Sequence, residues 1–224
     1  MTAKTLFITG ASSGIGAATA RAAVAKGWNV GLFARSKDKI DALAQELGKA
    51  AMALPGDATS LEDQQKAMAA IAESFGSIDA VYANAGTGLN TSGTDAGDPE
   101  EWQALVQLNI LGVLWTAKAA MPYLKDSTGH LLMTGSAAGR THIKGSVYGA
   151  SKWFVHGYAG NLAEEMREWG GRCTVIAPGM VDTSFFKEAK PDKLKPEDVA
   201  DAVMHALTAD PRVTTREIFL MPTH

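Results

Sequence analysis

Two polar side chains in an otherwise small and apolar stretch are suited to share one chemical task. The run SVYGASKWFVHG places Tyr148 and Lys152 four residues apart, and residues at that spacing are neighbours on a helix surface. A positive charge beside a phenol favours the phenolate and lowers its pKa toward the range in which general acid–base catalysis works. From this stretch alone, a packed tyrosine and a solvated lysine are the alternative.

A glycine-rich stretch near the start of the chain indicates a second kind of site. TGASSGIG follows a short apolar run and contains Gly10, Gly14 and Gly16. If a helix begins there, its free N–H groups and the positive end of its dipole would bind a pyrophosphate. The spacing G-x-x-x-G-x-G differs from the general dinucleotide fingerprint, and tight packing of the turn is the alternative.

The same residues also fit the G-x-S-x-G turn of serine hydrolases, with Ser12 as the nucleophile. That turn would sit on the first strand, without an HGGG-type oxyanion motif before it and without a histidine in a special turn after it. A hydrolase would also leave Tyr148 and Lys152 unexplained. We keep this function as a minor alternative.

Strand-like and helical segments alternate along the whole chain. Short apolar runs predict strands, and the segments between them have helical periodicity with glycine or proline at their ends. The predicted strands are TLFIT, WNVGLFAR, AMAL, IDAVYANAG, GHLLMTGS, RCTVIAPG and REIFLMP. This order predicts an α/β fold with a parallel sheet and helices on both faces, in which ligands bind at the carboxyl ends of the strands.

Composition and charge argue against several classes of partner and location. The 224 residues carry a net charge of −3, which gives no long-range attraction to nucleic acid or anionic membranes. Cys173 is the only cysteine, so we expect no intramolecular disulfide and a cytoplasmic protein. We find no signal peptide, no apolar run of membrane-spanning length and no metal-ligand spacing among the five histidines.

The motifs join into one pattern. TGASSGIG, NAG at residues 84–86, Asn109 in a long helix, Ser136 after a strand, YGASK and PGMVDT occur in one order across nearly the whole chain. This chain resembles the classical short-chain dehydrogenase/reductase family. The resemblance implies a single domain over residues 1–224 with a Rossmann-type, doubly wound parallel sheet. It also implies a nicotinamide dinucleotide and interconversion of an alcohol and a carbonyl by hydride transfer.

The resemblance assigns four catalytic roles. Tyr148 would be the general acid or base, and Lys152 would lower its pKa and hold the nicotinamide ribose. Ser136 would hydrogen-bond the substrate oxygen, and Asn109 would hold a water in a proton relay. From the residues alone, a turn serine is the favoured interpretation of Ser136, and a polar residue that bends a helix is the alternative for Asn109.

The resemblance also assigns a dinucleotide-binding set. Asp57 would hydrogen-bond the adenine ring, although a helix N-cap is its alternative; Thr183 would reach the carboxamide. The remaining members are Gly10, Ser12, Ser13, Gly14, Ile15, Gly16, Asn84, Ala85, Gly86, Tyr148, Lys152, Pro178 and Gly179.

The end of the second strand decides which dinucleotide is expected. NAD-binding proteins usually carry an acid there, which hydrogen-bonds the ribose hydroxyls. This chain has Ala34 and Arg35 instead, with no acid until Asp38. An arginine would bind a 2′-phosphate with charge-assisted hydrogen bonds. We therefore predict NADP(H) rather than NAD, with an ordinary surface arginine as the alternative.

The substrate is not readable beyond a small-molecule alcohol or carbonyl. Met180, Phe185 and Phe186 fit either an apolar wall or the core. The long apolar helices that contain Asn109 and Tyr148 predict a homo-oligomer, either a tetramer or a dimer. A Rossmann protein that binds a dinucleotide only as a sensor or scaffold is a further alternative.

Overall fold

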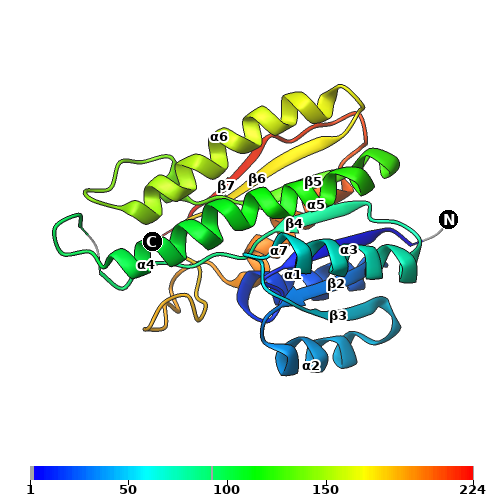
Figure 1. Ribbon diagram of the computed structural model, residues 1–224, viewed down its shortest axis with the longest axis horizontal. Helices are drawn as coiled ribbons and strands as arrows, with labels where there is room; N and C mark the ends of the chain where they lie inside the picture. The colour runs from blue at the N-terminus through cyan, green and yellow to red at the C-terminus, as the bar shows by residue number, and fades with distance from the viewer. Residues whose placement is uncertain (1–2, 92, 224) are drawn as a thin grey trace.

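One parallel sheet forms the centre of the molecule (Figure 1). The computed structural model describes residues 3–91 and 93–223. Its sheet has the strand order β3-β2-β1-β4-β5-β6-β7. The strands are β1 (Thr5–Thr9), β2 (Asn29–Ala34), β3 (Ala51–Pro55), β4 (Ala80–Ala83), β5 (His130–Thr134), β6 (Arg172–Pro178) and β7 (Glu217–Leu220). The order reverses between β1 and β4, so the predicted doubly wound sheet is confirmed.

Helices cover both faces of the sheet. One face is covered by α1 (Gly14–Ala25), α2 (Lys37–Leu47) and α7 (Pro196–Thr208), and the other by α3 (Leu61–Phe75), α5 (Gly112–Ser127) and α6 (Val147–Arg167). Side chains along β1 point to the two faces in turn. Leu6 and Ile8 pack in the core beneath α1, α2 and α7, and Phe7 packs in the core beneath α3, α5 and α6. Both faces of each central strand are therefore buried.

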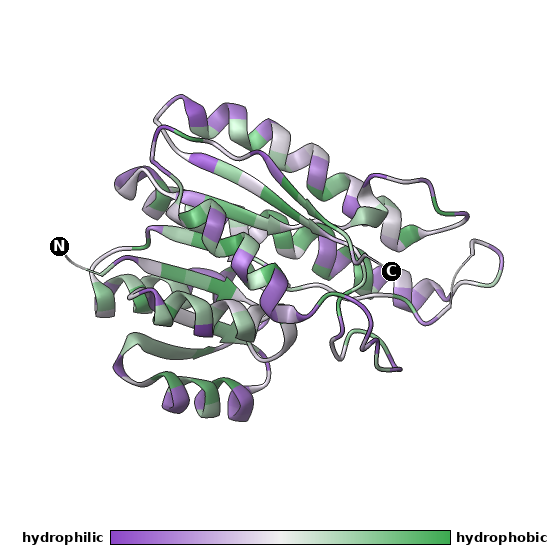
Figure 2. Cartoon of the chain, turned by 180° about the vertical axis from the view of Figure 1, so that it is seen from behind, coloured by the Kyte–Doolittle hydropathy of each residue, from purple (hydrophilic) through white to green (hydrophobic). Residues whose placement is uncertain are grey.

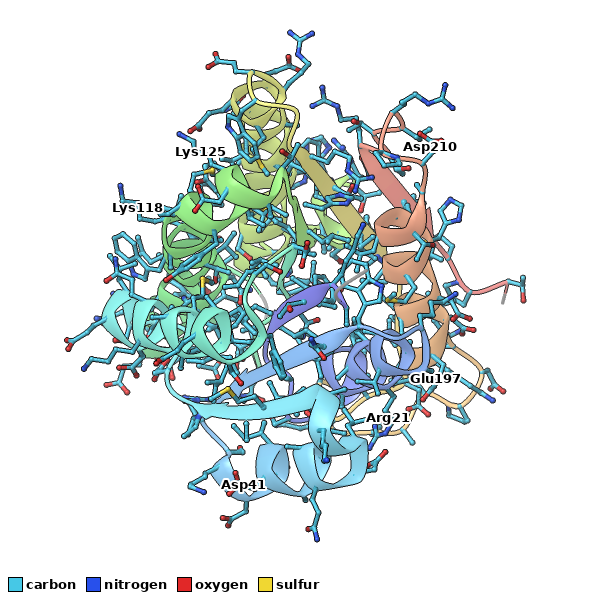
Figure 3. The ribbon with its side chains drawn as sticks, turned by 90° about the vertical axis from the view of Figure 1, so that its right-hand side faces the viewer. Arg21, Asp41, Lys118, Lys125, Glu197 and Asp210 are labelled. Atoms are coloured by element: carbon cyan, nitrogen blue, oxygen red, sulfur yellow. The ribbon has the colours of Figure 1, made fainter. Side chains whose placement is uncertain are left out.

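Hydropathy follows this layered arrangement. Figure 2 shows the central strands coloured mainly hydrophobic, as expected for a parallel sheet buried on both faces. Charged side chains lie at the periphery of the molecule in Figure 3, where the labelled ones are Arg21, Asp41, Lys118, Lys125, Glu197 and Asp210. The labelled charged side chains thus lie outside the apolar core.

The long helical pattern from residue 98 to 124 is not one regular helix. It comprises α4 (Pro99–Val106), a π-helical turn (Gln107–Leu111) and α5, which continues without a break in the chain. Asp98 caps its start by accepting a hydrogen bond from the N–H of Glu100. The π turn contains Asn109, whose side chain bonds outside the helix. A functional site often accompanies such a turn.

This helix also corrects one expectation from the sequence. Residues Pro99–Ser127 are long and apolar enough to cross a membrane by length and composition, and they form the one such helix in the part of the chain that the structure describes. Core helices of soluble proteins pass the same test, and this one packs against α3 and α6. Of its most apolar 18-residue window, 44% is buried within the chain.

Three connections extend beyond the carboxyl ends of the strands (Figure 1). They follow β4, β5 and β6, and their described residues are 84–91 with 93–98, 135–146 and 179–195. A short 3₁₀ turn, Ala137–Gly139, lies in the second of them. Together with the first turn after β1, these connections surround the place where ligands bind in such sheets.

Candidate active site

A cavity of about 1060 Å³ opens at the carboxyl ends of the strands. It is lined from both sides of the reversal in strand order, between β1 and β4, and by the three long connections. Of the predicted site residues, all line this cavity except Gly16 and Asn109. The fold therefore brings together residues that are spread from Gly10 to Thr183 in the sequence.

The first turn has the geometry of an anion site. Gly10 and Gly14 have φ values of 67° and 52°, a region that favours glycine. A Cβ at Gly16 would lie 2.3 Å from the Gly10 carbonyl oxygen, so Gly16 allows the turn to close without facing the cavity. Ser13 occupies the N-cap position of α1 but makes no side-chain bond to the helix N–H groups. Those donors therefore fit the pyrophosphate of a dinucleotide.

Ser12 lines the same turn, but it has no catalytic base. None of the described residues that line the cavity is a histidine. A serine nucleophile needs an adjacent base to remove its proton. The serine hydrolase alternative therefore finds no support in the structure.

Asn84 joins three strands at the floor of the site. Its Nδ2 donates to the Thr9 carbonyl oxygen at 3.1 Å, and its Oδ1 lies 3.1 Å from Thr134 Oγ1. The Thr9 hydroxyl accepts hydrogen bonds from the N–H groups of Asn84 and Ala85, both at 3.0 Å. This network holds the backbone close to Gly10, where a Cβ would lie only 2.9 Å from the Ala85 Cα.

Asp57 and Arg35 lie on the side of the cavity formed by β2 and β3. Asp57 accepts bonds from the N–H and hydroxyl of Thr59, whereas Ser60 caps α3 through Asp63 N–H. The N-cap alternative for Asp57 is thus wrong. Arg35 is exposed on the cavity wall, and none of the ion pairs found among the described residues includes it.

Tyr148 and Lys152 lie on α6, whose first turn is capped by the Ser146 side chain. The Lys152 Nζ atom lies 5.8 Å from the centre of the Tyr148 ring and donates to the Thr134 carbonyl oxygen at 2.8 Å. The Ser136 hydroxyl forms a hydrogen bond with the Tyr148 phenol. The three predicted catalytic side chains that line the cavity therefore converge on one point.

Ser136 also has the role proposed as its alternative. Its hydroxyl oxygen accepts a hydrogen bond from the N–H of Ala138 at 3.1 Å, which caps the short turn that follows β5. The turn fixes the serine, and the same hydroxyl faces Tyr148. The structural and the catalytic interpretation are thus compatible.

Asn109 is used differently from the other three. Its Oδ1 accepts from the Thr87 N–H and its Nδ2 donates to the Thr87 carbonyl oxygen, both at 2.9 Å. The Nδ2 also lies 3.2 Å from Ser151 Oγ. The side chain is fully buried, and its hydrogen bonds hold the connection after β4 in place beside Gly86. Its part in a proton relay stays a prediction.

Burial dominates the electrostatics of the site. It lowers the pKa of Lys152 to about 8. It also raises the pKa of the Tyr148 phenol, and the Ser136 hydroxyl partly opposes that shift. This direction is opposite to the lowered pKa expected from the sequence, because the surrounding protein disfavours the phenolate. The sequence showed the nearby lysine but not the burial of the phenol.

Apolar side chains form the outer wall beyond Tyr148. Met180 and Phe185 line the cavity and are 50% and 44% exposed, so they do not belong to the core. The Phe185 ring centre lies 5.7 Å from that of Tyr148, and a Cβ at Gly88 would lie 2.8 Å from the Phe185 ring. Thr183 packs its methyl group near Gly14, so this connection reaches the first turn. Phe186 is partly buried and packs edge-on against Phe185.

Two contributors were missed by the sequence interpretation. Thr134 binds both Lys152 and Asn84, and His156 lies behind Ser136. For His156 a signal existed, because it follows Tyr148 and Lys152 at the same four-residue spacing. Among the described residues, no group of three or more His, Cys, Asp or Glu side chains is arranged to hold a metal ion.

Comparisons with known proteins agree with this geometry. Residues 4–194 match the family model described as short chain dehydrogenase. An uncharacterized oxidoreductase of Staphylococcus aureus (strain MRSA252) is 37% identical over 228 residues, covering 99% of this chain and 98% of the relative. A relative from Staphylococcus epidermidis (strain ATCC 35984), also an uncharacterized oxidoreductase, is 35% identical over 226 residues, with coverage of 98% and 97%.

Solved structures give the same result. An alcohol dehydrogenase from the archaeon Thermococcus sibiricus, complexed with 5-hydroxy-NADP, is 31% identical with a TM-score of 0.90, over 98% of this chain and 97% of that chain. A 3-ketoacyl-(acyl-carrier-protein) reductase from Brucella melitensis, complexed with NADH, is 26% identical with a TM-score of 0.89, over 97% of each chain. This chain belongs to the short-chain dehydrogenase family of oxidoreductases.

Proposed function

We propose that this chain is an NADP(H)-dependent oxidoreductase that interconverts an alcohol and a carbonyl, with Tyr148 as the general acid or base. The observation that carries the proposal is the meeting of Tyr148, Ser136 and Lys152 at the cavity wall. A bound nicotinamide dinucleotide would supply the hydride for reduction or accept it in oxidation. Binding by Gly10, Gly14, Asn84 and their neighbours is supported by the open N–H groups of α1.

The protein groups have separate tasks. In reduction, Tyr148 gives its proton to the carbonyl oxygen while Ser136 donates a hydrogen bond to that oxygen and stabilises its developing charge. Because burial raises the pKa of the Tyr148 phenol, the proton is present at neutral pH. Oxidation requires the phenolate, so we expect its rate to rise with pH. The buried ammonium of Lys152 orients the nicotinamide ribose and favours that phenolate.

The coenzyme preference is supported by Arg35. It is the exposed cation at the end of β2, and Ala34 beside it offers no carboxylate for ribose hydroxyls. Among the similar structures, three hold NADP or 5-hydroxy-NADP and one holds NADH, and the preference proposed for this chain rests on its own residues.

The substrate side of the cavity supports an uncharged, apolar carbonyl compound. Met180, Phe185 and Ile143 line it, each at least 44% exposed. Arg140 lies nearby, but its guanidinium is paired with Glu217. Lys187 also lines the cavity, but the walls beside Phe185 are mainly apolar, so an alkyl or aryl ketone would contact side chains of similar polarity.

Assembly and location complete the proposal. We propose a homo-oligomer because the helix of residues 99–127 keeps much apolar surface outside the core, and because Val106 and Trp153 are 38% and 40% exposed. A cytoplasmic location fits the buried free thiol of Cys173. Light scattering at micromolar protein concentration tests the first point, and a monomer mass would contradict it.

The experiment that tests the activity is a panel of aryl, alkyl and acidic carbonyl compounds, assayed by loss of NADPH absorbance. We expect turnover of the uncharged members. Dinucleotide binding without turnover of any member would favour a sensor or scaffold instead. Equal or better rates for the acidic members would contradict the proposed substrate class.

A further inference from the structure

A buried histidine on α6 lies directly behind the Ser136 turn. His156 continues the four-residue spacing of Tyr148 and Lys152, so the three side chains share one face of the helix. Its residue is 5% exposed. Its Nε2 atom lies 3.4 Å from the Ser136 nitrogen and 3.2 Å from the Ser136 carbonyl oxygen. The imidazole thus contacts the backbone of the residue that hydrogen-bonds Tyr148, without lining the cavity.

The turn is shaped around this ring. A Cβ at Gly135 would lie 2.7 Å from His156 Nε2, and a Cβ at Gly139 would lie 2.6 Å from His156 Cδ2. Neither glycine has a positive φ, so backbone conformation does not require glycine at either position. The close approach of other atoms does: the imidazole at both positions, together with Val175 Cγ1 at 2.5 Å from a Cβ at Gly135 and the Lys152 backbone at 2.8 Å from a Cβ at Gly139. One glycine stands at each end of the segment that presents Ser136.

Charged groups from two other elements face the opposite side of the ring. The His156 Nδ1 atom lies 3.5 Å from Glu217 Oε1 on β7. Arg140, just after the turn, binds both oxygens of the same carboxylate. Burial and the charges of Arg140 and Lys152 lower the pKa of His156, and Glu217 and the hydrogen bond to the Ser136 backbone only partly oppose them, which favours the neutral imidazole.

The carboxylate selects one tautomer of this neutral ring. A proton on Nδ1 faces Glu217 favourably, and Nε2 is then free to accept a hydrogen bond from the Ser136 N–H. The other tautomer would let Nε2–H donate to the Ser136 carbonyl oxygen, at 3.2 Å, but it would direct the Nδ1 lone pair at a negative charge. Glu217 thereby sets which backbone group of Ser136 the ring binds.

We propose that His156 is a positioning residue that fixes the Ser136 backbone and so aims the Ser136 hydroxyl at Tyr148 and the substrate oxygen. Glu217 holds the required tautomer, and Arg140 holds Glu217. The kinetic part of this inference rests on the proposed function, because carbonyl reduction supplies the measured rate. The structural part does not depend on it.

The kinetic test is a double-mutant cycle. His156→Phe fills the slot between the glycines and removes both ring nitrogens. We expect kcat to fall by roughly tenfold to a hundredfold, the scale of a small misplacement in an active site, with the KM for the dinucleotide unchanged. In a Ser136→Ala background, the same change should cause no further loss. Independent, multiplying losses would overturn the proposal.

A second readout needs no turnover. Hydrogen exchange of the Ser136 and Ala138 amides reports on the turn directly, since the first faces His156 and the second binds the Ser136 hydroxyl. We expect faster exchange at both in His156→Phe at an unchanged melting temperature. Unchanged exchange would overturn the proposal. If no carbonyl compound is reduced, the proposed function fails, and this exchange result alone decides the role of His156.

Glu217→Gln guards against a folding defect, because it leaves the ring in place. Its matched control is Glu46→Gln, which weakens the exposed pair that Glu46 makes with Nε and Nη2 of Arg21, far from the site. We expect Glu217→Gln to lower kcat several-fold and to speed exchange at Ser136, and Glu46→Gln to change neither. Equal effects of the two variants would overturn the role of Glu217.

Discussion

The two ends of β5 use buried titratable groups in opposite ways. At the amino end, His130 is buried, and its Nε2 lies 2.7 Å from Thr174 Oγ1. At the carboxyl end, Thr134 accepts a hydrogen bond from the buried Lys152. Burial lowers both pKa values, that of His130 to about 3 and that of Lys152 to about 8.

The difference lies in charge and in access. At pH 7 His130 is neutral, so its burial carries no ionic desolvation cost, whereas Lys152 is mostly protonated and its burial does. Lys152 also lines the cavity and lies beside Tyr148, and His130 does neither. A shifted pKa therefore indicates a site only where a reacting neighbour and an opening accompany it.

The largest expected effect is the loss of turnover at Tyr148, beside the carboxyl end of β5. We expect Tyr148→Phe to lower the turnover number by about 10²–10⁴-fold, because the proton donor is lost, while dinucleotide affinity stays the same. Tyr158→Phe on the same helix is the control, since that ring stacks on Phe154 and does not line the cavity. Carbonyl reduction rates and dinucleotide titrations of both variants are the measurement. Near-normal turnover in Tyr148→Phe would show that Tyr148 is not the proton donor.

Arg35 is an exposed cation that also lies at the carboxyl ends of the strands. Charge-assisted hydrogen bonds to a 2′-phosphate contribute roughly 1.5–3 kcal/mol. We therefore expect Arg35→Ala to weaken NADPH binding by about tenfold to a hundredfold and to leave NADH binding almost unchanged. Adding Ala34→Asp should invert the preference, because the carboxylate repels the phosphate and accepts the ribose hydroxyls.

The measurement is kcat/KM for both coenzymes at one low salt concentration, since screening weakens surface charges. Arg21→Ala, on α1 and paired with Glu46, is the control. A wild-type preference for NADH would show that the interpretation of β2 is wrong. An unchanged NADPH preference in Arg35→Ala would place the phosphate elsewhere.

Local patterns revealed one part of this site, and long-range contacts supplied the other. The Tyr148–Lys152 spacing and the glycine turn after β1 are local, and the alternation of elements was enough to predict the sheet. The bonds of Thr134 to Lys152 and of Thr9 to Asn84 join distant segments, so no spacing shows them. The pKa of Tyr148 was predicted in the wrong direction for the same reason, because burial is a tertiary property.

The amino end of β5 should show itself in stability, not in activity. The folded pKa of His130, about 3, lies below its ordinary value of 6.5. Between these values the unfolded chain binds more protons, so this contribution is complete above pH 6.5 and is lost as the pH falls, by about 1.4 kcal/mol per unit. We expect His130→Gln to flatten this slope and to keep normal turnover.

Urea unfolding at pH 7, 6 and 5 measures this slope. His205→Gln, at an exposed histidine of α7, should keep the wild-type slope. An equal slope in His130→Gln and the wild type would show that burial of His130 does not lower its pKa. A loss of turnover in this variant would show that the amino end of β5 also contributes to activity.

Lys152 gives the most direct comparison with His130. Its folded pKa of about 8 lies below the ordinary 10.5. Below pH 8 both states hold the proton and the fold carries the full cost of a buried cation; between pH 8 and 10.5 the unfolded chain holds more protons, so stability rises with pH. Lys152→Met removes the charge at similar length. We expect its turnover to collapse while its free energy of unfolding at pH 7 does not fall below that of the wild type.

The pH dependence separates charge from packing. Loss of the hydrogen bond to the Thr134 carbonyl opposes the gain at every pH up to 8, but only the charge varies with pH. The stability of Lys152→Met relative to the wild type should therefore be about 2 kcal/mol less favourable at pH 9.5 than at pH 7. Urea unfolding of both proteins at the two pH values gives this difference. A constant difference would mean that the fold does not lower the pKa of Lys152, and a change of about 3.4 kcal/mol would mean that Lys152 is already neutral at pH 7, like His130.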